Sequence, residues 1–274
     1  MTEVSAPPSW PPLREVIHRF DLRADKSLGQ HFLLDANLLD RIRRCAEPLD
    51  GLNVIEIGPG PGGLTRALLQ SQAAHVTAIE VDPRAVAATQ SLAADGRLSV
   101  IEADALKLDL PGLIAAPRAI VANLPYNAGT PLLIRWLAEA GAYQAMTLMF
   151  QLEVAERIAA TPSTSAYGRL SVLAQWLCEV DIVLHVPASA FTPPPKVESA
   201  MVRLIPRPVQ PPALQFKAME RLTAAAFGQR RKMLRGALRE MGGETLLNKA
   251  GIAPDRRAET LSVAEFERLM LATL

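Results

Sequence analysis

The sequence predicts an α/β fold: a doubly wound, mostly parallel sheet with an antiparallel last strand, followed by a small all-helical C-terminal domain. Three observations lead to this class. From residue 52 onward, short β-branched runs alternate with helix-like stretches, which is typical of parallel sheets with right-handed crossovers. Two later strand-like runs are joined without room for a helix, so they should pair antiparallel. Beyond residue 212 only helical spacing remains.

Five strands of the parallel part come first. The run "LNVIEI" at 52–57 is apolar and β-branched, as expected for a strand buried on both faces. A glycine loop and the helix-like stretch "LTRALLQSQ" follow it. The next strand should be 76–81, and Pro83 behind it suits the first turn of a helix. The remaining parallel strands are expected at 98–103, 118–123 and 145–150.

The last two strands and the tail complete the order. The runs at 179–186 and 199–206 should be antiparallel neighbours, because only a proline-rich loop joins them. The segment "PRPVQPP" is dense in proline and lacks helical periodicity, which indicates a linker. Ser262 is a suitable N-cap for the last helix. Helices are expected after the linker at 213–229, 230–241, 244–251 and 263–273.

The chain therefore divides into four parts. Residues 1–25 form a leader that is largely disordered at its start, residues 26–205 the sheet domain, residues 206–212 the linker and residues 213–274 a basic helical domain. The net charge is only +1, but residues 206–274 hold 12 Lys and Arg against 7 Asp and Glu, whereas the preceding part holds 17 against 21. This asymmetry between an acidic body and a basic tail calls for an explanation, because the net charge alone predicts no polyanionic partner.

Composition excludes several other classes. Hydrophobic residues make up 49% and charged residues 21% of the 274, which is ordinary for a globular protein. Uninterrupted apolar runs fall short of the roughly 18 residues of a membrane span, so no membrane partner is expected. Cys45 and Cys178 form no Cys-x-x-Cys, which favours a reducing cytoplasm over a disulfide scaffold or zinc site. No metal is expected, because the histidines are not spaced as ligands: His18, His31, His75 and His185.

The glycine loop "VIEIGPGPGGLT" permits two interpretations. Gly58, Gly60 and Gly63 fit the G-x-G-x-x-G of a nicotinamide dinucleotide loop. Gly58, Gly60 and Gly62, with Glu56 two residues ahead, fit the E-x-G-x-G-x-G of a methyltransferase that binds S-adenosylmethionine (SAM). In both, glycine lets the backbone approach the ligand closely. The loop therefore indicates an adenosine-bearing cofactor and leaves its identity open.

Acidic residues end the next two strands. Glu80 lies 22 residues after Gly58, where a carboxylate can accept hydrogen bonds from ribose hydroxyls of either cofactor. Asp82 behind it is expected to be a helix N-cap. Asp104 follows the third strand, and an acid there suits the adenine amino group of SAM. This acid and the antiparallel hairpin favour SAM, because dehydrogenases more often keep a parallel last strand.

The segment "VANLPYN" ends the fourth strand, at the edge where doubly wound sheets bind ligands. Asn123 offers a side-chain acceptor, Leu124 and Pro125 direct a backbone carbonyl outward, and Tyr126 gives a flat face for a base. The exocyclic amine of adenine is a poor nucleophile, because its lone pair is delocalised into the ring. Two acceptors on its N–H groups favour pyramidalisation and stabilise the developing positive charge. These residues predict methyl transfer to adenine.

With these motifs in order, the sequence resembles the bacterial small-subunit (16S) rRNA adenine N6,N6-dimethyltransferases. The resemblance implies SAM-dependent dimethylation of two adjacent adenosines near the 3′ end of 16S rRNA, in a late pre-30S particle, and a role in small-subunit biogenesis. It runs from about Lys26 to the C-terminus and is carried by "KSLGQHFLLD", "VIEIGPGPGGLT", "AIEVD", "EADAL", "NLPYNAGTPLL", "AYGRLSVLAQ", "FTPPPKVESAMVRL" and "FGQRRKMLRGAL".

Matched position by position, the resemblance implies a set of site residues. Together with Gly60 of the loop, the implied cofactor contacts are His31, Leu33, Gly58, Glu80, Asp104 and Asn123. The residues implied to hold the target adenine are Asn123, Leu124, Pro125 and Tyr126, with Phe191 as a second aromatic face.

Two departures from the family pattern bear on these roles. The family often has Asn at the position of His31, which leaves open whether this residue contacts SAM through its side chain or its backbone. Ala128 and Gly129 stand where Ile and Ser are common, beside the tyrosine, and bear on the stiffness of that loop.

The basic tail fits an RNA substrate. Clustered Lys and Arg bind phosphate backbones without reading sequence. The candidates are Arg230, Arg231, Lys232 and Arg235, with Arg239 close by, and all are expected within three turns of one helix.

Three alternatives stay open at this point. Macrolide-resistance methyltransferases share Asn-x-Pro-Tyr-Asn and act on large-subunit rRNA, although "FTPPPKVESAMVRL" and "QRRKMLRGAL" favour the small-subunit family. A non-catalytic RNA-binding factor of the same fold is disfavoured because Glu80, Asp104, Asn123 and Tyr126 are intact. A nicotinamide dehydrogenase is the third. No coiled-coil pattern is present, so a monomer is expected.

Overall fold

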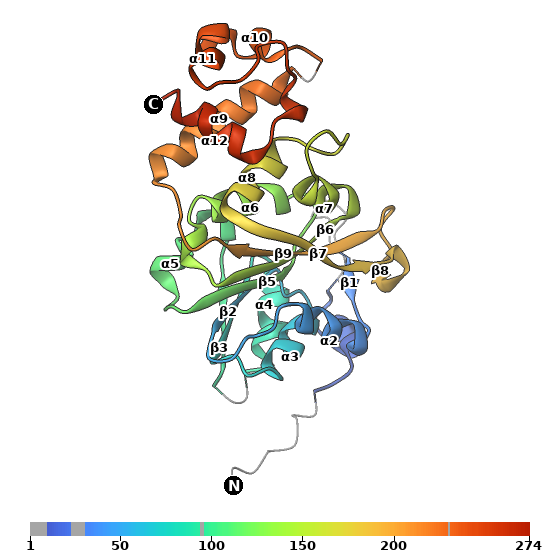
Figure 1. Ribbon diagram of the computed structural model, residues 1–274. Coiled ribbons are helices and arrows are strands. Elements are labelled where there is room, and N and C mark those ends of the chain that lie inside the picture. The colour runs from blue at the N-terminus through green and yellow to red at the C-terminus, as the bar shows by residue number, and fades with distance from the viewer. Residues whose placement is uncertain (1–9, 23–30, 94–95, 230) are drawn as a thin grey trace.

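The computed structural model of the protein describes residues 10–22, 31–93, 96–229 and 231–274. A seven-stranded sheet crosses the middle of the molecule (Figure 1). In spatial order its strands are β4 (Leu98–Glu102), β3 (His75–Glu80), β2 (Asn53–Ile57), β5 (Arg118–Asn123), β6 (Ala145–Gln151), β9 (Ser199–Pro206) and β7 (Cys178–Val186).

The predicted sheet topology is confirmed. Strands β2 to β6 are parallel to one another, and each begins and ends within one residue of its predicted bounds. Strand β9 lies between β6 and β7 and is antiparallel to both. Neighbouring residues of β2 enter different cores, Val54 on one face and Ile55 on the other, because side chains alternate along a strand. This is why consecutive residues of the strand, such as Val54 and Ile55, are both apolar.

Helices cover both faces of the sheet (Figure 1). One face carries α2 (Ala36–Cys45), α3 (Gly63–Leu69) and α4 (Pro83–Gln90). The other carries α5 (Leu110–Leu113), α6 (Gly129–Leu137), α7 (Leu152–Ala159) and α8 (Arg169–Leu177). The expected start of α4 is confirmed: the Asp82 carboxylate accepts from the backbone N–H of Arg84 at 3.0 Å, and Pro83 occupies the first turn.

The leader contains a helix that the sequence pattern did not predict. Helix α1 (Leu13–Arg19) buries Val16 in a small cluster with Ala85 and Ala88 of α4. Its seven residues are too few for helical periodicity to stand out beside four prolines. Packing against α4 stabilises it, as is usual for short helices.

Two short strands form a separate ribbon beside the sheet. Strand β1 (Phe32–Leu33) pairs antiparallel with β8 (Phe191–Thr192), with Leu33 opposite Phe191. Residues more than 150 positions apart in the sequence are thereby held together. The ribbon positions both segments beside the ends of the parallel strands.

The C-terminal part is helical, as predicted, but one of the helices predicted there is much shorter in the structure. The helices are α9 (Ala213–Gly228), α10 (Leu234–Ala237), α11 (Gly243–Lys249) and α12 (Val263–Leu271). The prediction of one helix over 230–241 is wrong, because among the described residues of this range only Leu234–Ala237 is α-helical. The N–H groups of Leu234 and Arg235 donate to the carbonyls of Arg256 and Pro254, so no helical turn precedes them.

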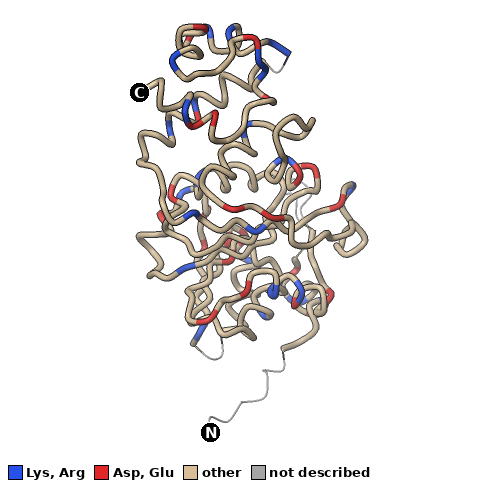
Figure 2. Tube along the Cα trace, viewed as in Figure 1, with Lys and Arg blue, Asp and Glu red and all other residues tan. Residues whose placement is uncertain are grey.

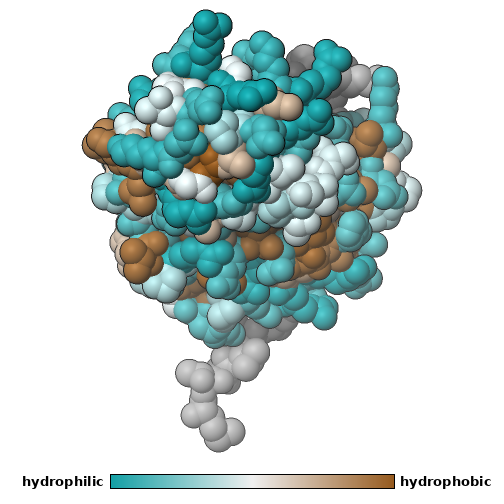
Figure 3. All heavy atoms as spheres, turned by 45° about the horizontal axis from the view of Figure 1, so that its top comes forward, coloured by the Kyte–Doolittle hydropathy of each residue, from teal (hydrophilic) through white to brown (hydrophobic). Residues whose placement is uncertain are grey.

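The C-terminal helices pack directly on the second helical layer, which is the layer formed by α5 to α8. Phe216 of α9 and Phe266 of α12 belong to the same core as Trp176 of α8, and the Trp176 indole N–H donates to Glu267 at 3.1 Å. The face in Figure 3, which brings these helices forward, is mostly hydrophilic with hydrophobic side chains scattered between. Within the described ranges, every helix is too short or too polar to cross a membrane.

Candidate active site

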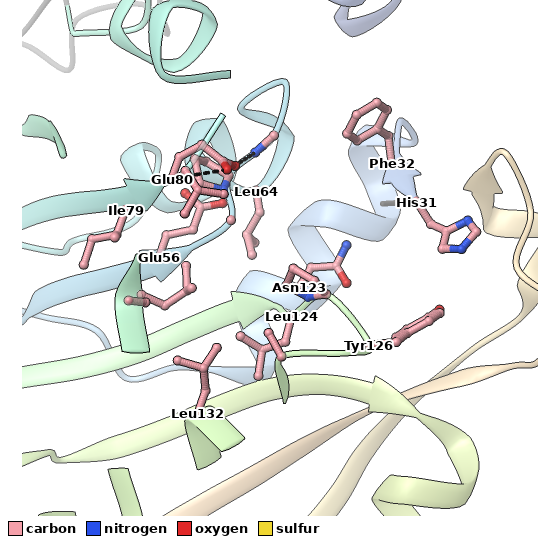
Figure 4. A pocket seen from close by; sticks show the side chains of 18 of the residues that line it. His31, Phe32, Glu56, Leu64, Ile79, Glu80, Asn123, Leu124, Tyr126 and Leu132 are labelled. Carbon is pink, nitrogen blue, oxygen red and sulfur yellow. Dashed lines mark hydrogen bonds between the residues drawn. The ribbon is translucent and has the colours of Figure 1, made fainter. Parts of the chain in front are cut away.

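A cavity of about 380 Å³ opens at the carboxyl ends of β2, β3 and β5 (Figure 4). Its size falls within the range of small-molecule sites. The structure brings every predicted cofactor and adenine residue to this one cavity. Its lining includes His31, Leu33, Gly58, Gly60, Glu80, Asp104, Asn123, Leu124, Pro125, Tyr126 and Phe191.

The glycines of the loop have two different roles. Gly58, Gly60 and Gly62 have φ values of +69°, +55° and +81°, a region that favours glycine. A Cβ on Gly62 would also lie 2.7 Å from Cδ1 of Leu92. Gly63 is not left-handed; a Cβ there would approach α1 and α2 side chains to 3.1 Å. The triplet with spacing two therefore shapes the loop, and Gly63 allows helix packing.

Glu80 ties the end of β3 to this loop. Its carboxylate accepts from the backbone N–H groups of Val81 at 2.7 Å and Asp82 at 3.0 Å, and from that of Gly60 at 3.4 Å. Only 5% of its surface is exposed. The carboxylate is thus fixed at the cavity wall with acceptor capacity remaining for a ligand hydroxyl.

Glu56 is a second buried carboxylate in the cavity, and sequence reasoning gave it no role beyond its place in the motif. It accepts a hydrogen bond from the Thr65 hydroxyl at 2.6 Å. Burial raises its pKa to about 8, the Thr65 hydrogen bond opposes the rise, and the nearby charge of Glu80 adds to it. Its position two residues before Gly58 was the signal in the sequence that could have placed it in the cavity.

Asp104 begins a short 3-10 helix at Ala105–Lys107, where its carboxylate accepts from the N–H of Leu106 at 3.0 Å. The loop is held from α6: Arg135 donates to the carbonyls of Leu106 at 2.7 Å and Leu108 at 2.6 Å. Arg135 was missed from the sequence, since it lies in an ordinary amphipathic helix. It positions the acid through the backbone of its loop.

The Asn-Leu-Pro-Tyr segment follows β5 directly into the cavity. Figure 4 shows the amide of Asn123 directed into the open space. The Pro125 carbonyl accepts from the N–H groups of Ala128 and Gly129 at 3.0 Å each. It is therefore committed to the start of α6, which leaves the Leu124 carbonyl as the backbone acceptor of this segment.

Tyr126 is held at its hydroxyl by Ser199, the first residue of β9, at 2.8 Å. Burial raises the pKa of the Tyr126 phenol, against the opposing effect of this hydrogen bond, so the hydroxyl stays protonated at neutral pH. The ring lies 5.6 Å from that of His31, centroid to centroid. His31 in turn meets the edge of Phe191 at 6.4 Å. Sequence reasoning missed Ser199.

The predicted RNA-binding residues lie elsewhere. Arg231 and Lys232 occupy the turn after α9, Arg235 lies in α10, and all three are exposed. Arg230 lies outside the described residues. Figure 2 shows Lys and Arg recurring around this end of the molecule, beyond the second helical layer. The cluster is therefore formed by a turn and a short helix rather than by one helical face.

In the part of the chain that the structure describes, no group of three or more His, Cys, Asp or Glu side chains is placed to hold an ion. The cavity instead combines a glycine cradle with carboxylates at successive strand ends. These features fit an adenosine-bearing cofactor whose ribose and adenine are both held by hydrogen bonds.

Comparison with known proteins agrees with this geometry. The model of the family "Ribosomal RNA adenine dimethylase" matches residues 21–273. The chain is 56% identical over 263 residues to Ribosomal RNA small subunit methyltransferase A of Gluconobacter oxydans (strain 621H), covering 95% of this chain and 87% of the relative. It is 57% identical over 266 residues to the protein of the same name from Chelativorans sp. (strain BNC1), covering 94% and 96%.

Two solved structures are similar over most of the chain. A dimethyladenosine transferase from Plasmodium falciparum has a TM-score of 0.73 and 27% identity, covering 88% of this chain and 96% of that one. The 23S rRNA methyltransferase ErmE has a TM-score of 0.65 and 29% identity, covering 88% and 98%.

Proposed function

The chain belongs to the ribosomal RNA adenine dimethylase family, and we propose that it transfers methyl groups from SAM to the N6 amines of two adjacent adenosines near the 3′ end of 16S rRNA. The curated relatives at 56–57% identity carry the name of a small-subunit methyltransferase. The similarity to ErmE, whose name gives 23S rRNA, is lower at 29%. The small subunit is therefore the favoured substrate.

One observation carries this proposal: Asn123, Leu124 and Tyr126 line the same cavity as Glu80 and Asp104. A cofactor site and a site for a planar amine substrate thus share one space. A nicotinamide dehydrogenase does not need the site for a planar amine. A non-catalytic RNA-binding factor needs neither this site nor the cofactor site.

The residues present fit SAM. A Cβ on Gly60 would lie 3.2 Å from the ring of Phe32, so only glycine leaves this part of the cradle open. Glu80 would accept from the ribose hydroxyls, and Asp104 from the adenine amine of the cofactor. SAM supplies an electrophilic methyl group on a sulfonium centre.

The chain's own residues then act on the target amine. The Asn123 side-chain oxygen and the Leu124 carbonyl oxygen accept hydrogen bonds from the two N–H groups of the amine. These bonds turn the nitrogen lone pair out of conjugation with the ring. As the nitrogen gains positive charge, these fixed dipoles stabilise it more than they stabilise the neutral amine. Tyr126 holds the base by stacking. The surplus proton on nitrogen leaves to water, since no buried base is aimed at it from the Asn-Leu-Pro-Tyr segment.

The assignment of RNA contacts and assembly rests on charge and position. We assign Arg231, Lys232 and Arg235 to phosphate contacts, because all three are exposed in the basic part of the chain. The substrate is a pre-30S particle in the cytoplasm, and the enzyme acts as a monomer. Residues 26–205 form the methyltransferase domain and 213–274 the helical domain, joined through 206–212.

One experiment tests the reaction and its substrate together. The protein is incubated with labelled SAM and small subunits from a strain that lacks this modification, and the rRNA is digested to nucleosides. Label in N6,N6-dimethyladenosine of 16S rRNA is the expected result. Label only in large-subunit rRNA would favour the ErmE-like activity, and absence of label would favour a binding factor; either refutes the proposal.

A further inference from the structure

The leader helix α1 contacts two helices that each begin at a cofactor-binding segment. Helix α3 starts directly after the glycine loop, and α4 starts just after the end of β3. A Cβ on Gly63 of α3 would come within 3.1 Å of Cδ1 of Leu13, so α1 lies close against this helix. Val16 packs in one cluster with Ala85 and Ala88 of α4. One short helix of the leader therefore contacts both elements that follow the cofactor cradle.

Helix α4 is itself bonded to the glycine loop. Thr89 follows Ala88 in this helix and is fully buried, and its hydroxyl donates to the carbonyl of Gly60 at 3.3 Å. The N–H of Gly60 in turn donates to the Glu80 carboxylate at 3.4 Å. Because Ala88 and Thr89 are adjacent, a shift of α4 after loss of its packing with α1 also moves the hydroxyl that holds the loop.

Phe32 is a second connection between α1 and the cradle. Its side chain packs against the cluster that contains Val16 and Ala85, and its ring lies 3.2 Å from the position of a Cβ on Gly60. Figure 4 shows the ring at the edge of the cavity, which Phe32 also lines. Pairing with Thr192 fixes its backbone. The ring is therefore close to both the α1 cluster and the glycine loop.

The residues just before α1 are attached to α3. The Arg66 guanidinium donates to the Pro11 carbonyl at 2.6 Å and lies over the Trp10 ring, 5.8 Å from its centroid. Among aromatic side chains, the indole of tryptophan gives the strongest cation–π contact. Trp10 also packs against the core between this helical layer and the sheet. These contacts fix the start of α1 to the helix that begins at the glycine loop.

We propose that residues 10–22 are a brace for the cofactor site, which holds α3 and α4 so that the glycine loop keeps the shape that binds SAM. Trp10 and Val16 are then positioning residues, since both lie outside the lining of the cavity. A loop already held in its binding shape loses less conformational freedom when the ligand binds. The brace therefore raises the affinity for SAM, whichever RNA is methylated, and leaves the methyl-transfer step unchanged.

Substitutions at two points of the brace test this role. Val16→Ala loosens the packing on α4. Val172→Ala is its matched control, because it removes the same atoms from a similarly buried site in α8, on the other face of the sheet. Trp10→Ala removes the ring under Arg66, whereas Trp10→Phe keeps an aromatic face there. Calorimetry measures the Kd for SAM, methylation of unmodified small subunits measures kcat and the KM for SAM, and thermal denaturation measures Tm.

The brace predicts weaker SAM binding with an unchanged kcat. The Kd and the KM for SAM should rise about fivefold in Val16→Ala, a part of the packing energy of two buried methyl groups. They should rise about threefold in Trp10→Ala, as expected for loss of a cation–π contact. The Kd of Trp10→Phe and of Val172→Ala should stay at the wild-type value, although Val172→Ala lowers Tm at least as much as Val16→Ala. An unchanged Kd in Val16→Ala or Trp10→Ala, or an equal rise in Val172→Ala, would refute the brace.

Protection from trypsin tests the same coupling in the wild-type protein. Because coupling between two binding events is reciprocal, a brace that strengthens SAM binding must itself be stabilised by SAM. Arg19 is exposed in α1, and Arg268 is exposed in α12. Saturating SAM should slow cleavage after Arg19 about fivefold, the factor expected for Val16→Ala, and should slow cleavage after Arg268 much less. Equal protection at both sites, or no protection at Arg19, would overturn the brace. The Kd and the cleavage rates do not require methyl transfer, so failure of the proposed function would leave both tests intact.

Discussion

The edge of the sheet and the C-terminal helices are built on different principles. At the sheet edge, Glu80 and Asn123 are the last residues of β3 and β5, so the strands themselves place them. In the C-terminal part, Arg231 and Lys232 lie in a turn and owe their position to no regular element. A buried site depends on single atoms, whereas a basic surface depends on summed charge. Single substitutions should therefore have larger effects at the sheet edge.

The largest effect is expected at the acceptor amide. Asn123→Ala removes one of the two acceptors for the target amine, and loss of one preorganised dipole of this kind costs about 10²–10³ in kcat. The Kd for SAM should stay measurable, because the glycine cradle and Glu80 are untouched. Single-turnover methylation of small subunits measures the rate and calorimetry the Kd.

Asn248→Ala in α11 is the matched control and should methylate at the wild-type rate. If Asn123→Ala also methylates at that rate, the acceptor mechanism is wrong.

The same contrast explains what could be predicted from the sequence. Strand ends are readable from apolar runs, and the acids and amide predicted at those ends line the cavity; their contacts with a ligand stay a prediction. Arg135 and Ser199 were not, because their partners lie 29 and 73 residues away and are brought near only by packing. The helix over 230–241 was predicted wrongly because good helix formers there give their N–H groups to carbonyls of a distant loop.

The next effect is on stability, at the glycine loop. Gly62→Ala places a Cβ in the left-handed region at φ +81° and 2.7 Å from Leu92, so strain and overpacking add. We expect a loss of about 2–4 kcal/mol in the free energy of unfolding, measured by urea titration. Gly51→Ala has a similar φ of +69° and open space around it, so it should lose only about 1 kcal/mol. Equal losses would show that crowding at Leu92 does not matter.

The buried carboxylate of Glu56 should make stability depend on pH. Its folded pKa is raised from 4.5 to about 8, so between these values the folded protein binds more protons than the unfolded chain. Stability contributed by the protonated group is then present below about pH 4.5 and is lost as pH rises toward 8, by at most about 1.4 kcal/mol per pH unit. Glu56→Gln should flatten this slope in denaturant titrations from pH 5 to 8. An unchanged slope would show that Glu56 is ionised in the folded protein throughout this range.

In the C-terminal part, we expect RNA affinity to be shared among several basic residues and to depend on salt. Arg231→Gln combined with Lys232→Gln should weaken binding to small subunits severalfold at low salt. It should also lower the slope of log affinity against log salt by about 1–2, since each phosphate contact contributes roughly 0.7–0.9. Lys249→Gln is the control, because its ammonium already donates to the Ala272 carbonyl at 2.8 Å. If both variants change the slope equally, general charge rather than this cluster binds the RNA.

The smallest effect is expected at the N-cap of α12, where the C-terminal helices follow local sequence rules after all. Ser262 Oγ accepts from the N–H of Glu265 at 3.2 Å, and the Glu265 carboxylate accepts from the N–H of Ser262 at 2.8 Å. Ser262→Ala should lower the free energy of unfolding by about 1 kcal/mol and leave kcat unchanged, because the helix lies on the far side of α8 from the cavity. Ser189→Ala, at an exposed position outside α-helices and strands, should change stability by less than about 0.5 kcal/mol. A loss of activity in Ser262→Ala at unchanged stability would show that the helical tail controls the site directly, and that the two regions are not as independent as their construction indicates.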